Sequence, residues 1–166
     1  MELTEQTSAD SGPPLEPVAP GYRNVLRVRM LISWAILWAA AAIADRALLD
    51  RYQVQGLLTF GLPCIALAAV VITPERIYRR LRYRLTDRLL QVVRGWLFHI
   101  DTVVPLVRVQ HIDVTRGPLD KMFGTAALVI HTAGTHNSVV TVPGLPPERA
   151  AEIRDIIREH VRTDFA

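Results

Sequence analysis

A change in chemistry at Thr73–Pro74 constrains the fold of this chain more than any other feature. The 19 residues before it, 54–72, contain no charged side chain. As a helix rising about 1.5 Å per residue, they would extend roughly 28 Å, close to the thickness of the hydrocarbon core of a bilayer. Six arginines follow within thirteen residues: Arg76, Arg79, Arg80, Arg82, Arg84 and Arg88. The pattern predicts a membrane helix with a basic flank.

A second apolar run lies earlier in the chain, from Met30 to Ala44. Continued through Asp45 and Arg46 to Leu49, it has 20 residues, which is the length of a membrane span. The two charges would then lie near the far headgroups, where they cost less than at mid-bilayer. With a turn at 50–53, the runs 30–49 and 54–72 predict a transmembrane helical hairpin. Its alanine-rich faces suit close helix packing or oligomerisation.

The distribution of arginines predicts the orientation of this hairpin. Three arginines precede the first run and six follow the second, whereas the turn region carries two, beside two aspartates. Cytoplasmic flanks of membrane helices are rich in Lys and Arg. The chain is therefore expected to cross the cell membrane twice, with both termini in the cytoplasm. An alternative is that the first run is a leader cleaved after Ala44. Such a leader would exceed the usual length of roughly 15–30 residues, and the second span would keep its orientation.

These features divide the chain into three parts. Residues 1–22 hold four acidic residues, four prolines and no Lys or Arg, a composition typical of a disordered tail. The hairpin occupies 23–75, and a cytoplasmic domain is expected over 76–166. The hydrophobic content of 50% fits a chain divided between lipid and water.

From Tyr83 onward the pattern is one of short strands separated by turns. The expected strands are 83–85, 89–93, 96–100, 103–105, 109–115, 125–132 and 138–142, with a helical turn over 119–123 that ends at Gly124. After Pro146-Pro147, apolar residues at 150, 153, 157 and 161 recur at helical spacing, which predicts a helix packed against the sheet. The domain is therefore expected to be α+β.

The same region carries an ordered set of motifs. They are 105–114 (PLVRVQHIDV), 116–126 (RGPLDKMFGTA), 132–134 (TAG) and 142–145 (VPGL). Together with the preceding helix pair, they resemble the bacterial pleckstrin-homology-like family found on small two-helix membrane proteins of the YdbS type. The resemblance covers about 83–161.

This resemblance implies a strongly bent antiparallel sheet or barrel that is capped by the C-terminal helix. It implies no enzymatic activity and no catalytic residue. Members of the family often accompany a larger relative with repeated domains of the same kind, so a homo-oligomer or a larger membrane protein with related domains is the expected partner. Some relatives also suggest an accessory factor in envelope stress or antimicrobial resistance.

Two surfaces are candidates for binding. The six flanking arginines are expected at lipid headgroups, where each basic residue contributes about 1 kcal/mol toward anionic lipid. Because this basic stripe adjoins an apolar span, membrane lipid is the expected partner and nucleic acid is not. The loop 116–123 is the candidate protein contact, since it combines Arg116 and Lys121 with Leu119 and Met122.

Signatures of catalysis and of metal binding are missing from the sequence. The five histidines do not stand at the spacing of a zinc motif, and Cys64 is the single cysteine. Neither a nucleophile elbow nor a glycine-rich phosphate loop occurs. We therefore expect no catalytic, metal or cofactor site. The expected function is a non-enzymatic, membrane-anchored interaction module, a scaffold or accessory subunit at the cytoplasmic membrane surface; the alternative is an anionic-lipid-sensing domain.

Overall fold

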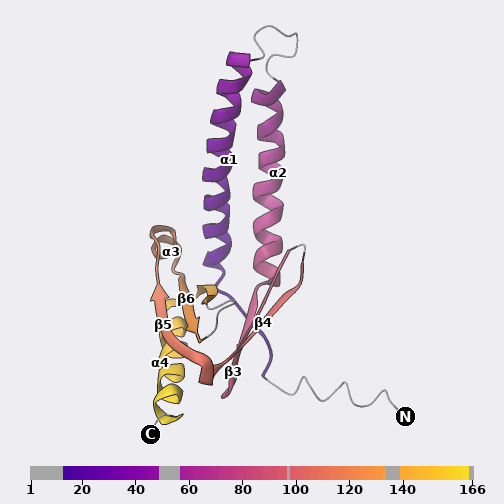
Figure 1. Ribbon diagram of the computed structural model, residues 1–166. Helices are drawn as coiled ribbons and strands as arrows, with labels where there is room; N and C mark the ends of the chain where they lie inside the picture. The colour runs from indigo at the N-terminus through magenta and orange to yellow at the C-terminus, as the bar shows by residue number, and fades with distance from the viewer. Residues whose placement is uncertain (1–12, 49–56, 97, 134–138, 165–166) are drawn as a thin grey trace, which may run out of the picture.

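The computed structural model describes residues 13–48, 57–96, 98–133 and 139–164. Two long helices, α1 (Gly21–Leu48) and α2 (Leu57–Arg80), lie side by side and stand on a domain of two sheets and a C-terminal helix (Figure 1). Both helices are long and apolar enough to cross a membrane, and little of their apolar windows is buried in the protein, 0% for α1 and 17% for α2. Exposed apolar surface of this extent is typical of helices that lipid surrounds.

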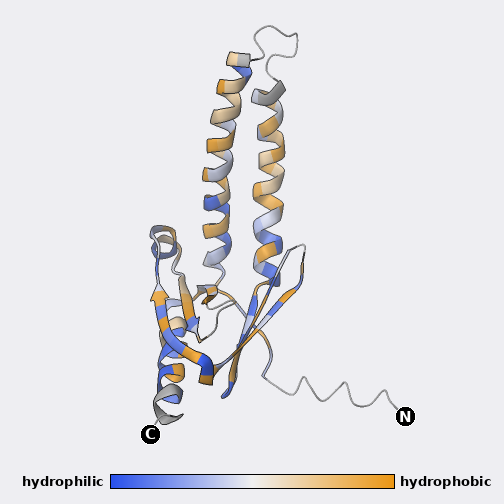
Figure 2. Ribbon diagram, in the orientation of Figure 1, coloured by the Kyte–Doolittle hydropathy of each residue, from blue (hydrophilic) through white to orange (hydrophobic). Residues whose placement is uncertain are grey.

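The predicted spans 30–49 and 54–72 fall largely within these helices, and the turn expected at 50–53 lies outside the described residues. Both helices extend further toward the sheets than the sequence suggested. Helix α1 begins at Gly21, and α2 continues through Pro74 to Arg80. Figure 2 shows the consequence: hydrophobic residues cover the shafts, and hydrophilic residues gather at the ends next to the sheets.

The domain below the helices is built from two antiparallel sheets, which confirms the α+β class. The strands are β1 (Glu16–Pro17), β2 (Arg82–Leu85), β3 (Leu89–Arg94), β4 (Ile100–Pro105), β5 (Val109–Thr115), β6 (Ala126–Thr132) and β7 (Val139–Leu145). The first sheet has the order β1-β2-β3-β4 and the second β5-β6-β7. A short 3-10 helix, η2 (Leu106–Arg108), carries the chain from one sheet to the other, as a bent pleckstrin-homology-like sheet requires.

The expected strand over 96–100 is wrong. Only Ile100 belongs to a strand, β4, and residues 96, 98 and 99, which the structure describes, lie outside any strand, in the loop between β3 and β4. Gly95 begins this loop with a φ of 136°, and a Cβ atom there would overlap the carbonyl oxygen of Phe98. A side chain at position 95 would clash with the backbone, so only glycine fits there. The apolar residues that alternate over 96–100 therefore follow a tight turn and, apart from Ile100, do not form a strand.

The helical predictions for the domain are confirmed. Helix α3 (Pro118–Phe123) ends at Gly124, which adopts the left-handed conformation with a φ of 64°. Helix α4 (Pro147–Asp164) buries Ala150, Ile153 and Ile157 against the sheets. This apolar stripe closes the hydrophobic core between the sheets.

The prediction of a disordered tail over 1–22 is wrong for residues 16–22. These residues belong to the folded domain or to the start of α1. Strand β1 pairs with β2, and Val18 is 3% exposed within the core. The amide of Ala19 donates to the carbonyl oxygen of Gly144 at 2.7 Å, which joins this segment to β7. Tyr22 and Val25 of α1 also lie in the core. The hairpin and the domain therefore share one hydrophobic core.

Candidate functional site

The junction between the hairpin and the domain brings basic residues together. Helix α2 ends at Arg80 and β2 begins at Arg82, so only Leu81 separates them. Leu81 is buried, and its amide donates to the carbonyl oxygen of Ile77 at 3.0 Å. Four of the six arginines expected at lipid headgroups, Arg76, Arg79, Arg80 and Arg82, are exposed at this junction.

The other two arginines of that set lie elsewhere. Arg84 donates twice to the Oε1 atom of Gln91, at 3.1 and 2.6 Å, so its guanidinium is held against the sheet. Arg88 is exposed in the turn between β2 and β3, which is the end of that strand pair remote from α2. At a strand rise of about 3.3 Å per residue, this turn is roughly 15 Å from Arg82. The structure does not bring Arg84 and Arg88 to the junction.

Glu75 links the two helices just above the junction. Its Oε1 atom accepts from Arg79 Nε at 2.8 Å, and its Oε2 atom lies 3.3 Å from Arg23 Nη1 and 4.0 Å from Arg27 Nη2. One carboxylate thus joins arginines of α1 and α2. The arrangement keeps the basic ends of both helices side by side.

The loop between β3 and β4 lies beside the same junction. The Nη1 atom of Arg80 donates to the carbonyl oxygen of Trp96 at 3.1 Å. Two apolar side chains of this loop are exposed, Trp96 at 41% and Phe98 at 76%. This feature was not predicted from the sequence, because the alternation of 96–100 suggested a strand there.

The candidate protein contact at 116–123 folds into α3 and the turn before it. Asp120 holds this segment: its Oδ2 atom accepts from the Gly117 amide at 3.1 Å, and its Oδ1 atom from Thr125 Oγ1 at 2.7 Å. Helix α3 packs on the first turn of α1, where Gly21 lies directly against the carbonyl oxygen of Phe123.

The side chains of this segment divide into two groups. Arg116 and Lys121 are exposed, and Met122 is 74% exposed. Leu119 instead packs against the core, together with Phe123. Three of the four predicted contact residues are therefore exposed, Arg116 just before α3 and Lys121 and Met122 on it, whereas Leu119 packs inward.

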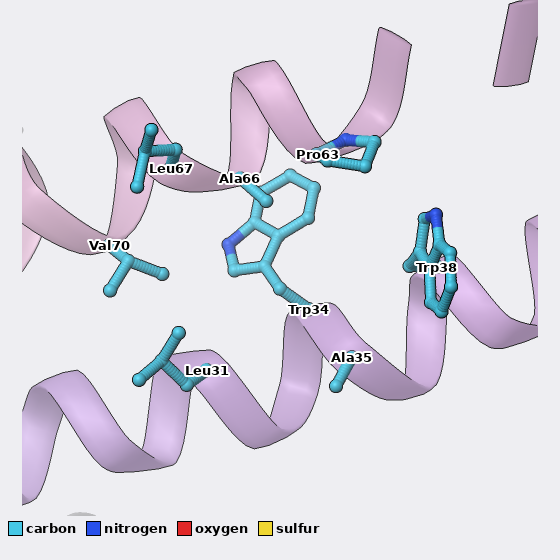
Figure 3. Close-up of a pocket in the computed structure, with 8 residues that line it drawn as sticks. All are labelled: Leu31, Trp34, Ala35, Trp38, Pro63, Ala66, Leu67 and Val70. Carbon is cyan, nitrogen blue, oxygen red and sulfur yellow. The ribbon is translucent and has the colours of Figure 1, made fainter. Parts of the chain in front are cut away.

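An apolar cleft separates the two helices (Figure 3). It has a volume of about 400 Å³. The indole of Trp34 projects from α1 toward Ala66 and Pro63 of α2, and Leu31, Ala35, Trp38, Leu67 and Val70 complete the lining. Two hydrogen bonds join the helices at Thr59: its carbonyl oxygen accepts from Trp38 Nε1 at 3.0 Å, and its hydroxyl donates to Asp45 Oδ2 at 2.9 Å. Such a lining suits hydrocarbon.

A more polar groove of about 410 Å³ lies in the domain itself, beside β4. Asp101, Thr102 and Arg108 contribute polar groups, and Val103 and Val140 contribute apolar ones. The Oδ2 atom of Asp101 accepts from Gln91 Nε2 at 2.7 Å, so this carboxylate is already engaged.

The histidines do not assemble a metal site in the part of the chain that the structure describes. His111 and Asp113 share one face of β5, with 3.0 Å between Nε2 and Oδ1, and His131 Nε2 lies 3.8 Å from the other Asp113 oxygen. No cluster of three or more ligands suited to a metal ion occurs among the described residues. These side chains form an exposed polar contact between β5 and β6.

Comparison with known proteins agrees with this geometry. The family model described as "Bacterial PH domain" matches residues 24–161, which includes nearly all of both helices and of the domain. The UPF0699 transmembrane protein YdbS of Bacillus subtilis (strain 168) is 28% identical over 152 residues, covering 90% of this chain and 94% of that protein. No solved structure gives a significant match.

Proposed function

This chain belongs to the bacterial PH domain family and carries that domain on transmembrane helices, and on that premise we propose that it is a non-enzymatic, membrane-anchored interaction module. It holds its PH-like domain at the cytoplasmic surface of the membrane, as a scaffold or accessory subunit for a protein partner.

The observation that carries this proposal is the shared core of hairpin and domain. Tyr22 and Val25 of α1 pack among the strands, and Leu81 alone connects α2 to β2. A flexible tether would let the domain tumble, whereas this junction gives it one orientation relative to the helices. A domain with one orientation presents the same surface to every partner in the membrane.

The charge distribution supports the cytoplasmic location. Six arginines of the two helices lie at the end of the hairpin next to the domain, and one, Arg46, lies in the last turn of α1 at the other end. Because Lys and Arg flanks are retained in the cytoplasm, this end and both termini lie inside the cell.

The proposed partner surface consists of Arg116 and the exposed residues of α3. Arg116 and Lys121 supply positive charge, and Met122 supplies an adaptable apolar contact. Since α3 adjoins the start of α1, a protein that reaches it is itself at the membrane. A second copy of this chain or a larger membrane protein with related domains meets this condition, provided that its facing surface is acidic with an apolar centre.

Photocrosslinking in intact cells tests this proposal. A photoreactive amino acid at Met122 is expected to give one dominant adduct with a membrane protein that also copurifies in stoichiometric amount, or with a second copy. The matched control is Val107 on η2, which is 70% exposed and lies where β4 joins β5. Absence of an adduct at 122, together with a solitary monomer in mild detergent, would overturn the proposal.

A second candidate function is recognition of anionic lipid by the four junction arginines. Their clustering at the ends of apolar helices supports it, because cationic groups at this depth attract anionic headgroups. The test requires the full chain, since a fragment starting at 82 would lack Val18, Tyr22 and Val25 from the core.

Native mass spectrometry of the full chain, released from mixed phosphatidylcholine and phosphatidylglycerol, provides the measurement. Glutamine at positions 76, 79, 80 and 82 together is expected to abolish preferential retention of phosphatidylglycerol, whereas Arg88→Gln leaves it unchanged. Equal retention of phosphatidylcholine and phosphatidylglycerol by the unmodified protein would contradict this function.

A further inference from the structure

The loop between β3 and β4 exposes two aromatic side chains close to the membrane helices. Trp96 and Phe98 are 41% and 76% exposed, and Ile100 at the start of β4 is also exposed. Figure 1 shows the loop rising beside the last turns of α2, on the side of the domain that faces the helices. Gly95, with a φ of 136°, lies where the chain leaves β3 for this loop.

The depth of this loop follows from its bond to α2. Arg80, whose side chain donates to the Trp96 carbonyl oxygen at 3.1 Å, is seven residues beyond the apolar boundary at Thr73. Seven residues of helix extend about 10 Å, and the headgroup layer on one side of a bilayer is roughly 5–8 Å thick. A loop that rises from this level alongside α2 therefore enters the headgroup layer.

The composition of the loop and its base matches that layer. Tryptophan is enriched at membrane–water interfaces because its ring is apolar and its N–H is polar. Arg94, exposed at the end of β3, and Arg80 place positive charge beside the aromatic rings. In water, by contrast, exposure of these rings would have no compensating interaction.

We propose that Trp96 and Phe98 insert into the interfacial layer of the bilayer and form a third membrane contact beside α1 and α2. The occupant of this surface is lipid. Trp96 and Phe98 lie in the headgroup layer, and Arg80 and Arg94 face the lipid phosphates. The contact fixes the tilt of the domain relative to the membrane plane, a property that goes beyond the proposed partner binding on α3.

Site-directed spin labelling of the full chain tests the insertion. Cys64 is the single cysteine, so Cys64→Ser gives a background for labels at Phe98→Cys and, as the matched control, Val107→Cys. Both positions are more than two-thirds exposed, so neither label disturbs the core. The purified protein is reconstituted alone into vesicles of phosphatidylethanolamine and phosphatidylglycerol at low protein-to-lipid ratio.

The proposal predicts that a water-soluble nickel chelate collides with the label at 98 several-fold less often than with the label at 107. Oxygen, which concentrates in the bilayer, should show the reverse order. The protection at 98 should not change with the protein-to-lipid ratio, since lipid and not a second copy provides it.

Three outcomes would overturn the insertion. Equal chelate access at 98 and 107 would place the loop in water. Protection that rises with protein density would assign it to contact between copies. Protection seen in native membranes but not in the pure lipid vesicles would assign it to another protein.

Discussion

Glu16 and Arg149, which are 133 residues apart in sequence, form an ion pair with 2.9 Å between Oε1 and Nη2. The second oxygen of the same carboxylate accepts a hydrogen bond from the Tyr83 hydroxyl at 2.8 Å. One side chain before the first membrane helix thus joins β2 at the start of the domain to α4 at its end. The domain is complete only when the segment that precedes the hairpin is in place.

Removal of this carboxylate should destabilise the domain. Glu16→Ala removes the acceptor of the Tyr83 hydroxyl and one of the two carboxylates that Arg149 contacts. Because Glu16 and Arg149 are partly exposed, we expect a loss of about 1 kcal/mol. Thermal unfolding in mild detergent, followed by near-ultraviolet circular dichroism, measures it. Glu152→Ala removes only the exposed pair that Arg149 makes within α4, at 2.9 Å, and should have a smaller effect. Equal effects of the two substitutions would refute the bridging role of Glu16.

The same network predicts a loss of stability at alkaline pH. Burial, and then the hydrogen bond to Glu16, raise the pKa of Tyr83 to about 12, whereas an unfolded tyrosine titrates near 10. The folded protein therefore retains a proton that the unfolded chain releases. This contribution is complete below pH 10 and disappears as the pH rises to about 12, and it amounts to roughly 2–3 kcal/mol.

The measurement is the unfolding temperature of the full chain between pH 10 and 12, compared with Tyr83→Phe. The variant has no proton to lose at this position, so its stability should fall less steeply over the same interval. Parallel curves for the two proteins would show that Tyr83 titrates normally.

Two glycines with positive φ should respond differently to alanine. Gly144 has a φ of 76°, and a Cβ atom there would overlap the ring of Tyr22. Gly124 has a φ of 64°, with open space where its Cβ would lie. Gly124→Ala should cost about 1 kcal/mol from backbone strain alone. Gly144→Ala adds a steric clash at the junction of α1 and β7, so it should cost roughly 3 kcal/mol. Thermal unfolding of both variants measures these losses. A larger loss of stability in Gly124→Ala than in Gly144→Ala would contradict this interpretation.

The elements that sequence analysis predicted correctly are those with strong local signals. Helix α4 has an apolar stripe with helical period, and α3 lies between Pro118 and Gly124, which favour a helix start and a helix end. Strand β5 was predicted with its observed bounds because Gly117-Pro118 interrupts the chain just after it. In each case the residues that determine the element lie within it or next to it.

The elements that were missed depend on distant residues. Strand β1 has two residues in a proline-rich segment, so no periodicity marks it, and only its pairing with β2 and the burial of Val18 make it part of the fold. The alternation of 96–100 suggested a strand, but the conformation of Gly95 turns the chain away from one.

Of the candidate site, the arginines at the end of α2 could be predicted, since a helix places them near its apolar part. Arg88 could not, because the direction of β2 carries it away from the membrane helices, and that direction is a property of the tertiary fold.

The account depends on the domain lying beneath the cytoplasmic face of the membrane, with the hairpin inserted. The most direct measurement is a pair of reporters fused after residue 166 in living bacteria. Green fluorescent protein at this position should be fluorescent and alkaline phosphatase inactive, because the former folds only inside the cell and the latter only outside. Active alkaline phosphatase together with dark green fluorescent protein would contradict the orientation, and with it the proposed roles of the junction arginines, α3 and the Trp96 loop.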